Sequence, residues 1–570
     1  MNYKLLSSVP HPIHSLIRDK IPHLSYTMPS DADISRFKAW LTGNGAKMGK
    51  IDWPSVDTIE GCRGAQATST IETNEIMMEI PIKLMMRVDL AFEEHQIGRL
   101  LSSSQDLLRG DVLLCVYIMC ECLKGDKSFY APYIAILPSP GSIVQWEDSE
   151  LDALQDQNLI HKAKNRRIML RNTYRRSVVA LSERFPEDID LSKYTYELFL
   201  FAWFCIQARA FGRRLPWTAM VPFADCLNHS NVQTKYDYDV NGNGLFRMYP
   251  TGSNCYPAGS EVFNSYGRRP NDNLLLDYGF SMLYNMWDSV EVMLALHREE
   301  EEYSRKSRLL LSMGKQTMGH SNIERLGFPF DALLFVRVVT FSENDLDVVA
   351  ERIARLRELS EETVNVQDAE GEGQAGGSVR FDGQRSQSSR GVSVADIRIA
   401  AGTVVSLESE LKAVRMLKER LLSMRKDWLT TMKEDEEALE AFSTAEKESQ
   451  ADGSGDTDDN LWKAKSSVVY RLTRKKIVEV NIARLDLLTG YLEQLMAGSS
   501  NTVSPSELSE HLMELSAVKQ DKRCNLVGAG NESPYHSTAG TTRMGVFSKE
   551  EDQVIRLRAY ITRLSRAPAP

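Results

Sequence analysis

The feature that most constrains the fold is an abrupt change of pattern along the chain. Between Phe37 and Met86, glycines alternate with short β-type runs, which indicates strands joined by tight turns. From Leu90 to about Phe201 the apolar residues recur at helical spacing, and Leu113, Tyr117 and Cys120 share one predicted helical face. From Pro222 to Phe280 short strands return, and the run YDYDVNGNGLFRMYP carries the Asn-Gly signal of a β-hairpin. The sequence therefore predicts one β-rich domain with a helical insertion at about 90–205.

Beyond about Trp287 the sequence is mostly helical in character. Five apolar residues share one helical face, namely Leu407, Leu411, Val414, Leu417 and Leu421. We therefore expect an α+β protein, with a flexible extension at 1–30, a β-rich domain at 31–285 and an all-α domain at 286–570. Three stretches poor in large apolar groups predict mobile loops at about 364–393, 448–460 and 525–545.

The charge balance argues against nucleic acid and membranes as main partners. The 570 residues carry a formal net charge of −10, which gives no overall positive field to attract phosphates or anionic lipid. No apolar run approaches the ~20 residues that a bilayer-spanning helix needs. We expect a soluble protein of the cytoplasm or nucleus. The first thirty residues contain one acid, Asp19, among several bases and hydroxyl residues, which keeps a transit peptide and a chloroplast location as an alternative.

The cysteines and histidines give no metal signature. The tightest cysteine group, Cys115, Cys120 and Cys122, lies in an apolar helical stretch and lacks paired C-x-x-C spacing. Buried free thiols are the expected interpretation. Five of the histidines show no ligand spacing to one another or to cysteine, namely His11, His14, His23, His95 and His161, and we predict no metal site.

The most informative motif is VPFADCLNHSN, residues 221–231, in which an apolar lead-in meets a polar cluster containing Asn228 and His229. Alone, such a pair most often ties down a turn. Further on, Tyr266 lies in NSYG and Tyr278 in LDYGF, each before a glycine that permits a sharp turn and close approach of another group. A single Tyr-Gly would indicate only a half-buried tyrosine, whereas the ordered combination indicates two hydroxyls facing one pocket.

In this combination the chain resembles the SET family, in the branch that contains Rubisco large-subunit methyltransferase and actin-histidine methyltransferase. The motifs occur in family order: EGCRGAQAT at 60–68, SFYAPYIAILP at 128–138, ARAF at 208–211, ADCLNHS at 224–230 and SYGRRPNDNLLLDYGF at 265–280. The runs TTMKEDEEAL and VVYRLTRKKI resemble that branch's helical substrate-binding domain. The resemblance covers about 37–488.

The resemblance implies an S-adenosylmethionine-dependent methyltransferase acting on the lysine ε-amine of a protein. It implies that Tyr266 and Tyr278 are the catalytic hydroxyls. It places the cofactor against Gly61, Arg63, Ala65, Arg209, Asn228, His229, Tyr266 and Phe280. In this interpretation the Arg209 guanidinium binds the cofactor carboxylate, a role that a planar bidentate donor suits. Tyr266 orients the target amine.

Two departures from the family pattern bear on this interpretation. Cys62 stands where glycine is usual, which crowds the cofactor turn slightly, although cysteine is small and is expected to fit; Gly61 stands where some relatives have an acid, which weakens one polar cofactor contact. Phe211 stands where the resemblance puts asparagine in the histidine-modifying member. A phenyl ring cannot hydrogen-bond an imidazole but can line a channel for a lysine stem, which favours lysine; ordinary core packing is the alternative for Phe211.

Alternatives remain open for the function. These are a protein-histidine methyltransferase and a SET-like adaptor without catalysis, although an adaptor has no need of Arg209, Asn228, His229 and Tyr266. The expected partner is a non-histone protein, such as a ribosomal or other abundant protein, and the expected state is a monomer.

Overall fold

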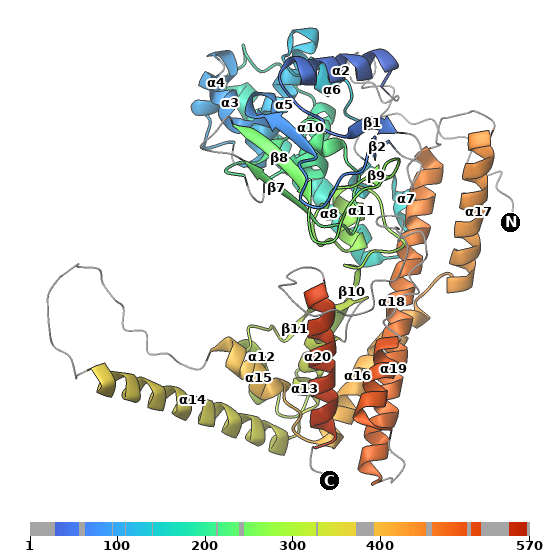
Figure 1. Cartoon of the computed structure of the whole chain (residues 1–570). Coiled ribbons are helices and arrows are strands. Elements are labelled where there is room, and N and C mark those ends of the chain that lie inside the picture. The colour runs from blue at the N-terminus through green and yellow to red at the C-terminus, as the bar shows by residue number, and fades with distance from the viewer. Residues whose placement is uncertain are drawn as a thin grey trace. The chain divides into compact units, whose positions relative to one another are not determined.

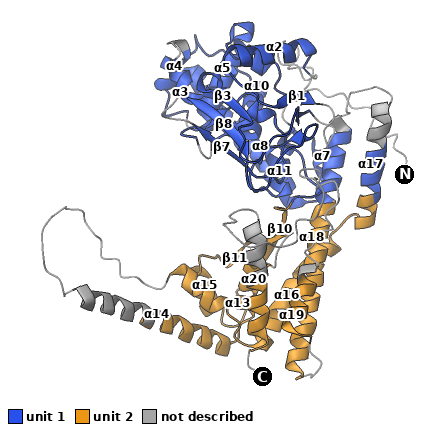
Figure 2. Ribbon diagram, viewed as in Figure 1, with its two compact units in different colours: residues 1–285, 437–471, 520–541 blue, residues 286–436, 472–519, 542–570 orange. Residues whose placement is uncertain are grey.

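The computed structural model describes residues 29–55, 63–93, 95–108, 110–138, 141–212, 215–238, 244–325, 329–371, 393–451, 459–498, 503–514 and 547–566. The chain divides into two compact units (Figure 2). Unit 1 comprises residues 1–285, 437–471 and 520–541, and unit 2 comprises 286–436, 472–519 and 542–570. The expected extension at 1–30 lies outside the described residues except for Pro29 and Ser30.

Unit 1 contains three small antiparallel sheets, with strand orders β1-β2-β9, β3-β8-β7 and β4-β6-β5 (Figure 1). The strands are β1 (Ile51–Ser55), β2 (Gly64–Ala67), β3 (Met78–Pro81), β4 (Met86–Arg87), β5 (Ala210–Phe211), β6 (Ala219–Met220), β7 (Thr234–Tyr238), β8 (Leu245–Pro250) and β9 (Glu261–Val262). Each sheet pairs a strand from before the helical insertion with one from after it, which confirms the interrupted β domain. The predicted hairpin is β7–β8, with Thr234 opposite Pro250.

The insertion supplies most of the helices of unit 1. They are α3 (Val88–Glu93), α4 (His95–Ser102), α5 (Asp111–Leu123), α6 (Ala131–Ile134), α7 (Asp148–Asp152), α8 (Gln157–Tyr174), α9 (Ala180–Arg184) and α10 (Tyr196–Arg209). They lie between α2 (Asp31–Gly43), which precedes the first strand, and α11 (Asn271–Asp277), which follows the last. The Thr195 hydroxyl caps α10 by accepting from the Leu198 amide, and the helix ends at Arg209 and leads directly into β5, which contains Phe211.

Helix α5 is buried more completely than its sequence suggested. The ten residues from Leu113 to Cys122 are all buried, whereas spacing predicted one buried face. A helix that is apolar all round belongs inside the core and not at its surface. Cys115, Cys120 and Cys122 are buried thiols outside any disulfide of the described residues, as expected, and burial raises the pKa of the Cys115 thiol.

Unit 2 is mostly helical. Its helices are α12 (Tyr303–Ser312), α13 (Phe330–Thr340), α14 (Glu343–Gly371), α15 (Val394–Gly402), α16 (Leu407–Lys426), α19 (Pro505–Glu514) and α20 (Phe547–Leu564), while α17 (Met432–Ala451) and α18 (Asp459–Met496) contribute to both units. The predicted apolar face of α16 is buried in the core of this unit. This confirms the α+β class with a helical C-terminal region.

Two findings in the C-terminal half differ from expectation. Strands β10 (Ser289–Ala295) and β11 (Met318–Glu324) form an antiparallel pair, because Val290, Val292 and Leu294 alternate with less buried residues and so fit a strand. Residues 364–371 continue α14 and 448–451 continue α17, where loops were predicted. Low apolar content does not separate a loop from a polar helix. The rest of the predicted loops, including 525–545, lies outside the described residues except Ser393 and the start of α18.

The described residues lack two features that would point to a membrane or a metal. None of their helices combines the length and apolar character that crossing a membrane requires. Their His, Cys, Asp and Glu side chains form no group of three or more placed to hold a metal ion.

Candidate functional site

Two chain segments lie side by side at the centre of the candidate site in unit 1. His229 and Asn264 form an isolated parallel bridge, in which the Asn264 amide donates to the Asn228 carbonyl at 2.8 Å and the Ser230 amide to the Asn264 carbonyl at 3.2 Å. The polar motif at 221–231 is therefore bonded directly to the segment that leads into Tyr266.

The Asn228 side chain extends this arrangement to the turn before β2. Its Nδ2 donates to the Arg63 carbonyl at 3.1 Å and to Glu261 Oε1 at 2.8 Å. Ala65 is fully buried in β2 opposite Val262 of β9. The structure thus brings the predicted residues Arg63, Ala65 and Asn228 together. Gly61 and Cys62 lie outside the described residues.

Four aromatic rings form one cluster. His229 stacks on Tyr266 with ring centroids 4.9 Å apart, and Tyr266 stacks on Tyr278 at the same distance. Phe280 is edge-on to Tyr278 at 6.1 Å and lies 6.3 Å from His229. The Tyr266 hydroxyl donates to the Leu227 carbonyl at 2.9 Å. The two tyrosines singled out from the sequence therefore share one site with His229 and Phe280.

The His229 ring is neutral and retains a donor. The Tyr266 amide donates to Nδ1 at 3.1 Å, so Nδ1 carries a lone pair and the proton lies on Nε2. The Asn264 carbonyl is farther from Nδ1, at 3.3 Å, and already accepts from Ser230. Burial lowers the pKa of His229 to about 4. Nε2 is buried and has no hydrogen-bond partner among the described residues, which leaves this N–H for a ligand.

Gly279 sets the position of Tyr278 and Phe280. Its φ is +88°, and a Cβ atom there would lie 1.9 Å from the Gly141 carbonyl oxygen, so only glycine fits. At Gly267, after Tyr266, φ is +104° but a Cβ would meet no atom within 4 Å, so that glycine serves the turn alone. Burial raises the pKa of Tyr278, which keeps its phenol protonated.

Buried amides anchor the segment that carries Tyr278. Asn271 Nδ2 donates to the Met282 carbonyl at 2.9 Å and its Oδ1 accepts from the Met282 amide at 3.0 Å. Asp277 accepts from Arg166 at 2.5 Å and from Arg269 at 3.4 Å. These bonds fix the segment on both sides of Tyr278 and so fix the position of its ring in the cluster.

Arg209 is held by a buried carboxylate. Its Nη1 donates to the Asp225 carbonyl at 2.9 Å and to Oδ2 at 3.3 Å, and Oδ2 also accepts from the Tyr133 hydroxyl at 2.6 Å. Burial raises the pKa of Asp225, which Arg209 opposes, and Asp225 holds the pKa of Arg209 above its ordinary value against the effect of burial. Phe223, at φ +74°, begins the tight turn that presents Asp225. Nε and Nη2 of Arg209 have no partner in the described part of the chain.

Phe211 lies in the hydrophobic core. Its ring is edge-on to Tyr236 at 5.3 Å and to Phe246 at 5.4 Å, and Phe246 is fully buried. These contacts support the packing alternative directly. A role for Phe211 in a substrate channel stays a prediction.

Sequence reasoning assigned no role to four residues that build the site, namely Tyr133, Asp225, Glu261 and Asn264. Tyr133 and Asp225 do stand inside two of the quoted motifs, SFYAPYIAILP and ADCLNHS. The motifs therefore contained both residues, but their hydrogen bond joins positions 92 residues apart and is visible only in the structure.

Comparison with known proteins starts from sequence. No protein-family model matches the chain. It is 26% identical over 322 residues to the actin-histidine N-methyltransferase of Mus musculus, which covers 54% of this chain and 52% of that protein. It is 27% identical over 325 residues to the Homo sapiens protein of the same name, with the same coverage. The chain spans about half the length of the curated relatives it matches.

Solved structures show the class of fold. The SET domain of LSMT bound to lysine and AdoHcy superposes with a TM-score of 0.57 at 20% identity, over 82% of this chain and 94% of that one. Rubisco LSMT bound to AdoMet superposes with a TM-score of 0.56 at 20% identity, over 84% and 99%. The chain therefore has the SET-domain fold, as the ordered motifs predicted.

Proposed function

We propose that this chain is an S-adenosylmethionine-dependent protein methyltransferase and that its acceptor is a lysine ε-amine. The observation that carries the proposal is the juxtaposition, in one SET-type site, of stacked His229, Tyr266 and Tyr278 rings with a buried N–H of His229 that lacks a described partner. The fold and the names of the relatives support the same class of chemistry.

The residues present fit the cofactor. The Nε and Nη2 edge of Arg209 is the geometry that binds a carboxylate in two parallel bonds. His229 Nε2 offers a buried donor, the Arg63 carbonyl accepts from the neighbouring Asn228 side chain, and Phe280 belongs to the same ring cluster as His229. When bound, S-adenosylmethionine supplies a methyl group activated on a positively charged sulfur.

The site also suits an amine acceptor. Lysine has an ordinary pKa of ~10.4, yet only its neutral form has the lone pair that accepts a methyl group. Aromatic walls that exclude water favour the neutral amine. The Tyr266 hydroxyl donates a hydrogen bond to the Leu227 carbonyl, which fixes the direction of its O–H and turns the acceptor side of its oxygen toward an amine N–H. The neutral His229 ring adds no positive charge beside the reacting atoms.

Lysine and histidine are both candidate acceptors. The curated relatives are named for histidine, and this favours histidine as the second candidate. Solved structures of this fold were obtained with lysine and with monomethyllysine. In this chain position 211 is phenylalanine, whose ring has no group to bond an imidazole nitrogen. We therefore propose lysine first.

The substrate type, oligomeric state and cellular compartment of the enzyme are part of the proposal. With a net charge of −10 the chain has no general attraction for nucleic acid. We further propose a non-histone protein substrate and a monomeric enzyme of the cytoplasm or nucleus, with the chloroplast as alternative. The helical unit 2 is the proposed substrate-binding region.

The test is transfer of labelled methyl from S-adenosylmethionine into a methyltransferase-depleted extract, followed by acid hydrolysis. We expect label in methyl-lysine and a fall of about 100-fold in Tyr266→Phe. Tyr256→Phe is the matched control, because Tyr256 is buried and, like Tyr266, donates its hydroxyl to a backbone carbonyl, that of Phe263, at 2.9 Å. Label in methylhistidine would select the second candidate. Absence of both label and cofactor binding would select the adaptor.

A further inference from the structure

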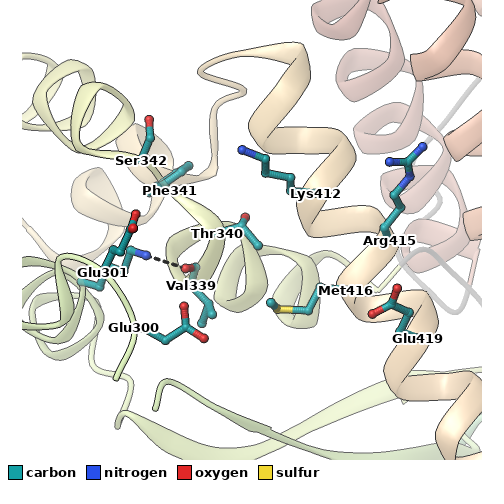
Figure 3. Close-up of a pocket in the computed structure, with 11 residues that line it drawn as sticks. Glu300, Glu301, Val339, Thr340, Phe341, Ser342, Lys412, Arg415, Met416 and Glu419 are labelled. Carbon is teal, nitrogen blue, oxygen red and sulfur yellow. Dashed lines mark hydrogen bonds between the residues drawn. The ribbon is translucent and has the colours of Figure 1, made fainter. Parts of the chain in front are cut away.

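Unit 2 contains a cavity of about 440 Å³ between the loop before α12, the end of α13 and one face of α16 (Figure 3). Val339 and Met416 are among its apolar lining residues, and Phe341 beside them is buried. The volume lies within the range of ligand pockets and is large enough for one or two side chains of a partner. None of the site residues described above belongs to this cavity.

Every basic side chain on the cavity wall is already engaged. Lys306 is only 3% exposed, and its Nζ donates to the Val339 carbonyl at 2.8 Å. Lys412 pairs with Glu408 at 2.9 Å and Arg415 pairs with Glu493 at 2.6 Å. Lys412 and Arg415 are therefore paired with acids that do not line the cavity, and the buried Lys306 ammonium is held by a backbone carbonyl.

The acidic side chains of the wall are not engaged in this way. Glu300, Glu301 and Glu419 line the cavity and have no ion pair with any described residue. Figure 3 shows the carboxylates of Glu300 and Glu419 reaching toward each other from opposite sides, with Met416 between them. The C-terminal carbonyls of α13 add partial negative charge at the same place. The cavity thus combines a negative rim with an apolar floor.

The protein itself shows which chemistry this wall accepts. The Lys306 stem is buried, and its ammonium lies on a carbonyl at the end of α13. Burial lowers the pKa of Lys306, while Glu300 and Glu301 act to raise it, so the acidic loop supports a cation here. A second long cationic side chain would meet Glu300, Glu419 and the Met416 thioether in the same manner.

We propose that this cavity binds a lysine or arginine side chain that a partner protein presents next to an apolar residue. Charge complementarity selects the cation, and the apolar floor packs the stem of the side chain. This interaction is independent of methyl transfer, because it uses only unit 2 residues and needs no cofactor.

The test uses the full chain and a fluorescein-labelled, end-capped peptide Gly-Leu-Lys-Leu-Arg-Gly, with fluorescence anisotropy as the readout. We expect the wild type to bind this peptide and not a version with Glu in place of Lys and Arg. The pair Glu300→Gln and Glu419→Gln should weaken binding about tenfold, as loss of two charge-assisted contacts predicts. The matched pair Glu351→Gln and Glu358→Gln removes the same charge from the exposed face of α14 and should leave binding within twofold.

The outcomes separate cleanly. A loss confined to the cavity pair supports the site. An equal loss in both pairs would mean that net charge alone attracts the peptide, and it would overturn the proposal, as would failure of the wild type to bind. Loss of binding accompanied by a changed circular-dichroism spectrum is resolved by Met416→Leu, which keeps the volume and charges and should retain affinity within threefold.

Discussion

Each unit of the molecule holds an arginine against a buried carboxylate that also accepts from a tyrosine, and the two arrangements differ in how many of the arginine's donors have protein partners. In unit 2, Arg337 donates to both oxygens of Glu410, at 2.5 and 2.8 Å, and to the Gly402 carbonyl at 2.7 Å, while Tyr560 donates to Glu410. In unit 1, Arg209 reaches Asp225 through Nη1 alone.

Exposure follows the same division. The Arg337 side chain is 4% exposed, whereas that of Arg209 is 19% exposed, although Asp225 itself is fully buried. All three guanidinium nitrogens of Arg337 have protein partners, so that arginine stabilises the packing of α13 against α16 and α20. Arg209 has two guanidinium nitrogens, Nε and Nη2, without a partner among the described residues. Unused donors on a well-held arginine therefore mark a binding group better than burial or charge does.

The largest expected effect is on stability and comes from the Arg337–Glu410 pair, in which every guanidinium nitrogen has a protein partner. Lysine at position 337 cannot reproduce the paired bonds to Glu410 and the bond to Gly402, so Arg337→Lys should lower the free energy of unfolding of unit 2 by about 3 kcal/mol. Urea titration followed by hydrogen exchange of α13 and α16 peptides measures this loss. A change below about 1 kcal/mol would show that the network is not structural.

The second largest expected effect is the pH dependence of stability that comes from the neutral His229 ring. His229 has a pKa of about 4 in the folded chain against ~6.5 when unfolded, so the unfolded chain binds more protons between these values. Its contribution to stability is full above pH 6.5 and is lost as pH falls toward 4. Between pH 7 and pH 5 the wild type should lose about 2 kcal/mol more than His229→Gln. Equal losses would contradict a buried neutral imidazole.

A smaller effect concerns Asp225 as a positioning residue for Arg209. Asp225→Asn keeps the shape but removes the charge, so KM for S-adenosylmethionine should rise about tenfold while kcat changes less than twofold. Tyr133→Phe removes only the second partner of Asp225 and should raise KM about threefold. Steady-state kinetics separates the two parameters. A parallel fall in stability with unchanged KM would assign Asp225 a structural role only.

Much of the fold was predictable because its signals are local. Strand runs before and after the insertion, the Asn-Gly hairpin and the apolar face of α16 each follow from periodicity over a few residues. The β10–β11 pair was predictable by the same rule, since Val290, Val292 and Leu294 alternate, but the helical character of the surrounding sequence concealed it.

The site was predictable as a set of residues and not as a geometry. Ordered motifs indicated Asn228, His229, Tyr266 and Tyr278, and the structure places them together. The hold of Asp225 on Arg209, the Asn228 bond to the Arg63 carbonyl and the stacking order of the rings depend on contacts between distant segments. No spacing in one sequence encodes such contacts.

The most direct test of the account is calorimetric titration of S-adenosylmethionine into wild type, Arg209→Lys and Arg337→Lys. Lysine at 209 keeps the charge beside Asp225 but loses the second edge of the guanidinium. We predict that Arg209→Lys weakens cofactor binding about thirtyfold with little change in stability, and that Arg337→Lys binds like the wild type. Wild-type affinity in Arg209→Lys, or no binding by the wild type, would contradict the claim that the unused edge of Arg209 serves a cofactor.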